Sequence, residues 1–309
     1  LVALESAPLV PWPTLAAWIP GRVAWWLQAL QQALPPPEQR VLRIAHRGAS
    51  AYAQENSPAA IRQAAALGAD MVEIDIHTTA DDVPVVSHDE DLKRLYGVEG
   101  LIAHHTLAEL RAMTPPGREP LPTLDEIARL GQELAIGLYL DLKRLSPASA
   151  QAMHQTVAQA DLLRYTIFAS FRPDILAEIK AAVPQASTSI LFNSVHVDPV
   201  PLARSIRADY VHPCWENAAP QPHRLLTPDW LRQVREAGLG IVCWHEERPD
   251  EIAALYDLGV DAICSDTPDR LTAQENARRP GGAAGPLSIL PPAFSPDEAE
   301  ASSSGLQPP

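Results

Sequence analysis

Polar and apolar side chains alternate in the segment 71–77, where Glu73, Asp75 and His77 stand at every second position. This period of two predicts a β-strand that carries the three polar side chains on one face. Two carboxylates spaced in this way form a hard-oxygen site suited to Mg²⁺ or Ca²⁺. The chain has no Cys-x-x-Cys or His-Glu-x-x-His motif, which disfavours zinc. The alternative is a solvated or ion-paired face, because buried polar groups need partners.

Two histidines follow other short apolar runs. His46 is succeeded by Arg47 and Gly48, and His88 comes directly after the run 83–87. A histidine at a strand end is commonly structural, and His88 alone is equally compatible with a surface turn. An arginine, however, offers a planar fork for a phosphate, and a glycine lets the backbone approach a ligand closely. These neighbours therefore favour a functional role for His46, and the run 83–87 could place His88 as a second histidine over the same opening.

Four further polar or aromatic residues stand at the ends of later apolar runs. Asp141 and Lys143 share a face, which indicates either a buried ion pair or a third metal carboxylate beside a phosphate-binding ammonium. Trp244 fits the core and a binding site equally well. Asp266, ahead of Thr267-Pro268, is most simply a helix cap.

These candidates lie on a repeated pattern of short strands and helices. Strands are predicted at 41–45, 71–77, 135–140, 166–170, 188–192, 209–212, 240–244 and 262–265, with an additional extended piece at 83–87. Helices are predicted after the N-cap Ser57, from Thr123 to 134 with Glu126 completing a capping box, and over 229–237 and 249–258.

Eight β-then-α units within residues 39–275 predict a (β/α)8 barrel of the TIM type, in the α/β class. An open, doubly wound sheet is the rival, and the lack of a Gly-x-Gly-x-x-Gly turn after the first strand weakens it. In such a barrel the residues at the carboxyl ends of the strands meet at one mouth. The candidate residues are therefore expected to form one site there.

The two ends of the chain differ in composition from residues 39–275. Residues 1–38 form a predicted amphipathic extension that holds four of the seven tryptophans, at positions 12, 18, 25 and 26. Residues 276–309 are rich in Pro, Gly, Ala and Ser and predict a disordered tail. A membrane contact through residues 12–30 is possible in principle, but packing of this segment against the barrel is favoured.

Composition limits the partners. The 309-residue chain has a formal net charge of −14, which argues against nucleic acid and anionic membranes because both attract clustered Lys and Arg. Three cysteines without framework spacing indicate reduced thiols. Neither a long apolar window nor a targeting signal is recognisable, so a cytoplasmic location is expected. The oligomeric state is not indicated.

In combination, the motifs resemble those of the glycerophosphodiester phosphodiesterase family. They occur in the family's order and spacing over about residues 40–273. The matching stretches are Ala45-His46-Arg47-Gly48-Ala49, Gln54-Glu55-Asn56-Ser57, Glu73-Ile74-Asp75, Pro84-Val85-Val86-Ser87-His88-Asp89, Asp141-Leu142-Lys143, Ala169-Ser170-Phe171, Trp244, and Gly259-Val260-Asp261 through Asp266-Thr267-Pro268.

The resemblance implies a TIM barrel that hydrolyses glycerophosphodiesters to an alcohol and glycerol 3-phosphate with a divalent cation, Mg²⁺ or Ca²⁺. By position it makes His46 and His88 the acid–base pair. The implied metal ligands are Glu73, Asp75 and Asp141. The implied substrate-binding residues are Arg47, Lys143, Trp244 and Glu55.

The sequence departs from the family pattern in three places. Asp141 stands where Glu is usual, which bears on metal preference, and Ser57 replaces a usual Thr. After Trp244 the family commonly has Thr-Val-Asn, whereas this chain has His245-Glu246-Glu247. We expect a more acidic pocket rim, suited to a cationic head group such as choline or ethanolamine.

Two other functions stay open from the sequence. The first is a lysophospholipase D-like enzyme acting on lipid phosphodiesters, with the tryptophans of residues 1–38 delivering the lipid. The second is a non-catalytic barrel that binds phosphodiesters, whose expected mark is the loss of a catalytic histidine or metal acid.

Overall fold

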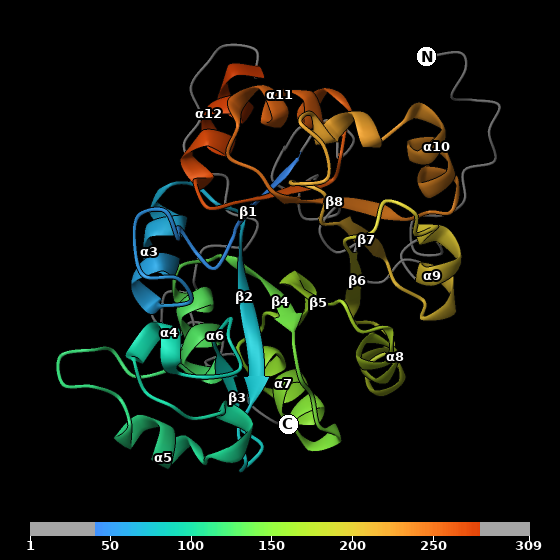
Figure 1. The fold of residues 1–309 in the computed structure, drawn as a ribbon. Helices are drawn as coiled ribbons and strands as arrows, with labels where there is room; N and C mark the ends of the chain where they lie inside the picture. The colour runs from blue at the N-terminus through green and yellow to red at the C-terminus, as the bar shows by residue number, and fades with distance from the viewer. Residues whose placement is uncertain (1–40, 279–309) are drawn as a thin grey trace, which may run out of the picture.

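The computed structural model describes residues 41–278, and these residues form a closed barrel with helices around it (Figure 1). Eight parallel strands pair in sequence order, and β1 pairs with both β2 and β9, which closes the sheet. They are β1 (Leu42–Ala45), β2 (Met71–Thr78), β4 (Gly137–Leu142), β5 (Thr166–Ser170), β6 (Ser187–Phe192), β7 (Tyr210–Pro213), β8 (Gly240–His245) and β9 (Ala262–Ser265). The predicted TIM barrel is confirmed, and the open-sheet rival is wrong.

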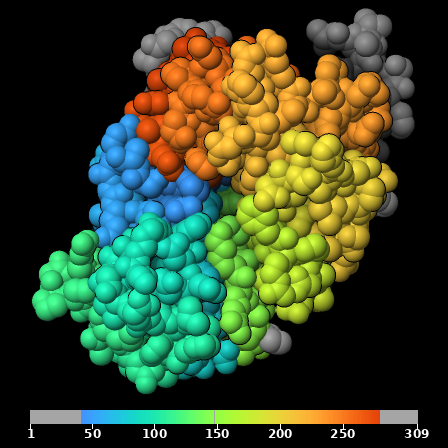
Figure 2. Space-filling model, in the orientation of Figure 1, coloured from blue at the N-terminus to red at the C-terminus, as the bar shows by residue number. Residues whose placement is uncertain are grey.

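Helices occupy the connections between these strands. They are α3 (Pro58–Ala66), α6 (Leu124–Glu133), α7 (Pro147–Gln159), α8 (Pro173–Ala182), α9 (Pro199–Ser205), α10 (Pro228–Glu236), α11 (Pro249–Asp257) and α12 (Pro268–Arg278), with short 3-10 turns η4 (Leu163–Tyr165) and η5 (Pro222–Leu225). In the same orientation, the surface is hollowed near its centre, where the segments coloured blue, green, yellow and orange meet (Figure 2).

The predicted helix starts are confirmed at the level of single hydrogen bonds. The Ser57 side chain accepts from the Ala60 amide at the start of α3, with Pro58 in the first turn. Thr123 and Glu126 form a reciprocal capping box at the start of α6. These caps matter because they fix where the preceding loop ends, and the loop before α3 belongs to the barrel mouth.

One strand begins later than predicted. The prediction of a strand over 135–140 is wrong at its start, because Ala135 adopts a left-handed conformation with φ 52° after the end of α6. The Ile136 amide then donates to the Gly131 carbonyl at 3.0 Å, which closes the helix. As a result β4 runs over Gly137–Leu142 and carries Asp141 within the strand, in register with Asp75 of β2.

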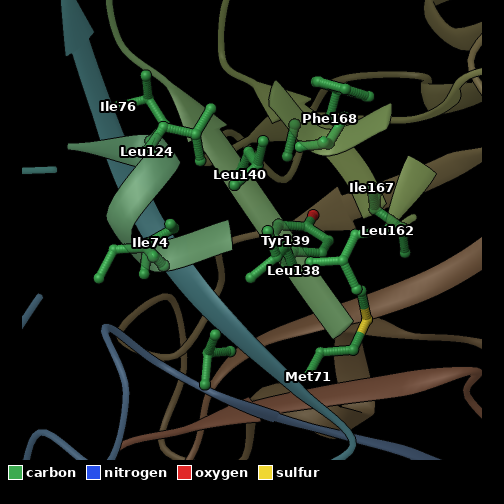
Figure 3. Packing of buried hydrophobic residues seen from close by; sticks show 14 of the residues in the cluster. Met71, Ile74, Ile76, Leu124, Leu138, Tyr139, Leu140, Leu162, Ile167 and Phe168 are labelled. Carbon is green, nitrogen blue, oxygen red and sulfur yellow. The ribbon is translucent and has the colours of Figure 1, made fainter. Parts of the chain in front are cut away.

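The strands are buried on both faces, and the two faces carry different chemistry. Ile74, Ile76, Leu138 and Leu140 belong to the hydrophobic core shared with Leu124 of α6 (Figure 3). The alternate residues of β2 and β4 point into the barrel. The alternation of apolar and acidic residues along these strands therefore separates packing from the site.

The segment between β2 and α6 contains structure that the sequence patterns did not reveal. The extended piece at 83–87 is β3 (Pro84–Val86), an antiparallel addition to β2. It is followed by α4 (Lys93–Tyr96), η3 (Ile102–His104) and α5 (Leu107–Ala112), which enclose a small apolar cluster of their own. These helices are too short to show a helical period in the sequence.

Several predictions concern residues outside the described range. The extension 1–38 and residues 279–309 of the predicted tail lie there, and so does the membrane contact proposed for 12–30. Helix α12 ends at Arg278, beyond the predicted barrel limit at 275. Within 41–278 no helix is long and apolar enough to cross a bilayer. All three cysteines are free thiols, with Cys243 and Cys264 buried.

Candidate active site

A cavity of about 250 Å³ opens at the carboxyl ends of the barrel strands. Each of the eight strands, or the residue directly after it, contributes to its wall. The charged and polar lining residues are His46, Arg47, Glu73, Asp75, His88, Tyr139, Asp141, Lys143, His212, Glu216 and His245; the others are Phe171, Leu191, Cys214, Trp244 and Cys264. The residues that the family resemblance assigns to the site therefore meet in one place, apart from Glu55.

Three carboxylates form the acidic centre of the cavity. Oxygen atoms of Glu73, Asp75 and Asp141 all lie within 4.8 Å of one another, and all three residues are buried. The Lys143 ammonium lies 2.8 Å from Asp75 Oδ1 and also contacts Asp141 Oδ2. The Arg47 amide donates to Glu73 Oε2 at 2.9 Å. The predicted Asp141–Lys143 ion pair and the predicted carboxylate cluster therefore coexist.

The three carboxyl groups differ in pKa because their surroundings differ. Burial, with the neighbouring Asp75 charge, raises the pKa of Glu73 well above its usual range. Burial also raises the pKa of Asp141, although Lys143 opposes the shift. The pKa of Asp75 is lowered, because Lys143 and Arg47 outweigh its burial. Three ionised carboxylates would thus carry more negative charge than the neighbouring cations offset, which adds to burial in raising the pKa values of Glu73 and Asp141.

The cluster fits a divalent cation. Its donors are hard carboxylate oxygens, the type that Mg²⁺ and Ca²⁺ prefer. Asp141 Oδ1 is buried and has no hydrogen-bond partner. A buried oxygen of this kind is costly unless a ligand or ion meets it. Within residues 41–278 no other group of three His, Cys, Asp or Glu residues could hold a metal.

His77 does not join this cluster, although strand periodicity placed it on the same face. Its Nε2 lies 3.3 Å from the His88 carbonyl oxygen. The ring lines a neighbouring groove of about 380 Å³, which shares Lys143 with the cavity at the barrel mouth. His77 therefore supports the backbone that carries His88.

His46 is held between a carboxylate and a second imidazole. Its Nδ1 lies 2.6 Å from Asp266 Oδ1, and its ring stacks on His245 with centroids 4.6 Å apart and planes 8° apart. Burial lowers the pKa of His46 despite the Asp266 hydrogen bond, and His245 lowers it further. The hydrogen bonds from His46 and Ser50 lower the pKa of Asp266 to about 2, although burial opposes the shift. The side chain of Asp266 thus serves His46 and Ser50, which the helix-cap interpretation did not anticipate.

His88 has a similar arrangement on another element. Its Nδ1 lies 2.7 Å from Asp89 Oδ1, and Arg94 of α4 binds Asp89 Oδ2 with its Nε at 2.5 Å. Arg94 also binds both carboxylate oxygens of Glu55. The short helix α4, absent from the sequence prediction, therefore positions the second histidine through Asp89.

Glu55 supports the site through Arg47. The Arg47 Nη1 donates to both Glu55 oxygens, at 3.2 and 3.3 Å, and the Arg47 Nε lies 3.5 Å from Asp75 Oδ2 without a hydrogen bond. Asn56 donates to Asp75 Oδ2 at 2.9 Å. Arg47 and Asn56 both adopt left-handed backbone, with φ 54° and 57°. The loop after β1 is therefore shaped to bring these side chains onto the carboxylates.

The floor of the cavity is a neutral polar network. Tyr139 donates to Ser189 Oγ at 2.8 Å, and its hydroxyl lies 2.6 Å from His212 Nδ1. Burial lowers the pKa of His212 to about 3, so this imidazole is uncharged at neutral pH. His212 can therefore accept or donate a hydrogen bond without adding charge to the site.

The expected acidic rim after Trp244 is not arranged as predicted. Glu246 is buried, where it accepts hydrogen bonds from Trp244 Nε1 at 3.2 Å and from the Arg248 guanidinium. The Glu247 side chain accepts from the Asp266 amide at 2.8 Å. Neither residue lines the cavity; the acidic group on that side is Glu216. The position of Glu246 and Glu247 next to Trp244 in the sequence did not predict their placement, because both side chains bind partners in the surrounding loops.

Comparison with known proteins identifies the kind of site. Residues 46–270 match the model of the Glycerophosphoryl diester phosphodiesterase family. The chain belongs to this family. A glycerophosphodiester phosphodiesterase from Caldanaerobacter subterraneus subsp. tengcongensis is 27% identical over 253 residues, covering 79% of this chain and 100% of the relative. Glycerophosphodiester phosphodiesterase 1 from Bos taurus is 26% identical, covering 70% and 74%.

Solved structures agree with the family membership. An Oleispira antarctica phosphodiesterase in complex with the product sn-glycerol-3-phosphate has a TM-score of 0.66 and 25% identity, covering 76% of this chain and 96% of that protein. A glycerophosphodiester phosphodiesterase from Parabacteroides distasonis has a TM-score of 0.63 and 26% identity, with the same coverage. As a member of the glycerophosphoryl diester phosphodiesterase family, the chain is a phosphoric diester hydrolase.

Some site residues were missed by sequence reasoning. Asp89, Arg94, Asn56 and His245 each contact a candidate residue directly. Asn56 and Asp89 stand within family-like stretches and could have been found there. The contact of Arg94 with Glu55 joins residues 39 positions apart and leaves no local signal.

Proposed function

We propose that the chain hydrolyses glycerophosphodiesters to an alcohol and glycerol 3-phosphate, with a divalent cation and with His46 and His88 as the acid–base pair. The observation that supports it most directly is the matching surroundings of the two imidazoles. Each has a carboxylate at Nδ1, from Asp266 and Asp89 respectively. Among residues 41–278, neither Nε2 has a protein hydrogen-bond partner. A carboxylate that orients an imidazole and leaves its other nitrogen for substrate is typical of enzymatic general bases.

In this proposal His46 is the base of the first step, because its lowered pKa keeps the imidazole neutral near pH 7. Its Nε2 accepts the proton of the glycerol hydroxyl beside the phosphoester, and that oxygen bonds to phosphorus. The bond from phosphorus to the alcohol breaks as His88 protonates the departing oxygen. Water then opens the cyclic phosphate with the two roles reversed, which yields glycerol 3-phosphate.

The remaining residues bind and orient the diester. Arg47 and Lys143 offer the phosphoryl oxygens a guanidinium and an ammonium at the edge of the carboxylate cluster. Glu73, Asp75 and Asp141 would hold the cation, which would oppose the negative charge of the phosphoryl group. The shorter side chain of Asp141, compared with a usual Glu, affects the choice between Mg²⁺ and Ca²⁺.

A panel of glycerophosphodiesters tests the proposal, with glycerol 3-phosphate measured in Mg²⁺, in Ca²⁺ and in EDTA. We expect product with at least one metal and none in EDTA. His46→Ala and His88→Ala should each lower kcat/KM by about 10²–10⁴, the usual contribution of a general acid or base. The exposed His196 provides a matched control, because His196→Ala should leave the rate unchanged.

Calorimetry with the metal alone separates catalysis from cation binding. Asp141→Asn should weaken metal binding, whereas His88→Ala should not. The non-catalytic alternative predicts a different pattern, in which diesters bind but no metal supports hydrolysis. Full activity of His46→Ala with metal bound would refute the acid–base assignment.

A further inference from the structure

One carboxylate of the catalytic cavity has no role in the proposed hydrolysis. Glu216 follows β7 and lines the cavity together with the acid–base and metal-binding candidates. Its Oε2 is buried and has no hydrogen-bond partner, and its Oε1 accepts only a long contact of 3.5 Å from Asn217 among the described residues. A buried carboxylate oxygen left in this state is costly, and at a binding site the missing partner is commonly a ligand.

The loop that carries Glu216 is fixed by the segment after Trp244. Arg248 donates to the Glu216 carbonyl at 3.2 Å and to the Pro220 carbonyl at 3.4 Å. Glu246 in turn holds Arg248 through its backbone amide at 2.9 Å and its Nε at 2.7 Å. The Glu246–Arg248 pair therefore clamps the loop between β7 and α10, and the Glu216 side chain is presented from a constrained backbone.

The cavity wall carries side chains of both charges. Arg47 and Lys143 lie at the carboxylate cluster, where the phosphate is expected. Glu216 supplies a carboxylate without a cationic partner among the described residues, and the side chain of Phe171, which is 46% exposed, lines the same cavity. A carboxylate and an aromatic ring that line one cavity form a combination that proteins use for ammonium groups.

We propose that Glu216 recognises the departing alcohol of the diester and selects an alcohol that carries a primary ammonium, as in glycerophosphoethanolamine. This inference rests on the proposed function, because it names the chemical class of the alcohol in the proposed diester substrate. An ammonium offers both charge and N–H donors to the unpartnered oxygen. A quaternary ammonium offers charge without a donor, and a polyol offers donors without charge.

The test compares kcat/KM for glycerophospho-ethanolamine, -choline and -glycerol in the full chain and in Glu216→Gln. The glutamine side chain has the shape of glutamate and keeps one acceptor oxygen, but it carries no charge. We expect the ratio of the ethanolamine to the glycerol diester to fall about tenfold or more, since hydrogen bonds to charged groups are the stronger kind. The loss should fall mainly on KM, with the choline diester intermediate.

Three further measurements make the result specific. Glu216→Asp should restore part of the ratio, and Glu133→Gln, at a side chain 61% exposed, should change nothing. The melting temperature of Glu216→Gln should stay equal or rise, because a neutral amide replaces a carboxylate whose buried Oε2 has no partner. A large fall in melting temperature would mean that Glu216 is structural, which overturns the inference.

The outcomes distinguish this inference from the proposed function. If the wild-type chain hydrolyses the diesters but Glu216→Gln lowers all three rates by one factor, Glu216 does not select the alcohol. If the ratio of the ethanolamine to the glycerol diester is unchanged in Glu216→Gln, Glu216 likewise does not select the alcohol. If the wild-type chain hydrolyses none of the diesters with any metal, the proposed function fails and this inference fails with it.

Discussion

The contact between His46 and Asp266 is the one on which the proposed general base depends most, and Asp266→Asn tests it. Asp266 Oδ1 lies 2.6 Å from His46 Nδ1 and 2.7 Å from Ser50 Oγ. Because Ser50 donates to this oxygen, the amide should keep its oxygen in place. His46 would retain a neutral hydrogen bond and lose only the charge beside it.

The size of the effect follows from that loss. A hydrogen bond to a charged group contributes about 1.5–3 kcal/mol, against about 1 kcal/mol for a neutral one. A difference of about 1.4 kcal/mol is tenfold in rate. The two kinds of hydrogen bond differ by about 0.5–2 kcal/mol, so we expect kcat/KM to fall by about two- to thirtyfold. If the amide inverts and selects the wrong imidazole tautomer, the fall approaches about 10⁴, the loss seen for the Asp-to-Asn change in serine-protease triads.

The pH profile gives an independent readout. Asp266 raises the pKa of His46, so its neutralisation should lower that pKa further. The acid limb of kcat/KM should then move to lower pH by roughly one unit, since a pKa unit corresponds to about 1.4 kcal/mol. A structural role for Asp266 would not produce this displacement.

The matched control lies three residues further along the chain. Asp269 accepts a hydrogen bond from Tyr52 at 2.7 Å on the exposed surface, and Asp269→Asn should leave the rate within twofold of wild type. Thermal melting of both variants excludes unfolding as the cause. Wild-type kcat/KM and an unmoved pH profile in Asp266→Asn would refute the assignment of His46 as a carboxylate-oriented base.

Two other predictions concern the wild-type pH profile and the loop after β1. Burial and the neighbouring His245 lower the pKa of His46, so the acid limb of wild-type kcat/KM should lie below the usual value of about 6.5; a limb above it contradicts the base role. Gly48→Ala should lower the free energy of unfolding by about 2–5 kcal/mol in denaturant titrations, because Gly48 has φ 82° and an added Cβ would lie 2.7 Å from Ala60 Cβ. Gly97→Ala shares a positive φ of 69° but meets nothing within 4 Å, so it should cost only about 1–2 kcal/mol; equal losses would mean that crowding is unimportant.

Local periodicity in the sequence predicted much of the fold and part of the site. The period of two along β2 placed Glu73 and Asp75 on one face, and the structure puts both in the cluster with Asp141. Ser57 and Thr123 capped the predicted helices because capping depends on residues within one turn. The same reasoning gave no helix between β3 and α6, where α4 has only four residues.

The amino-acid sequence by itself therefore determined the eight-strand barrel, the family resemblance and which residue types stand at the strand ends. Only the tertiary structure decided which of these residues contact one another. His46 meets Asp266 across 220 positions, and Glu246 turns away from the cavity toward Arg248 while Glu216 lines it. A strand's period fixes the face of a side chain, but its partners depend on which distant loops meet at the closed barrel mouth.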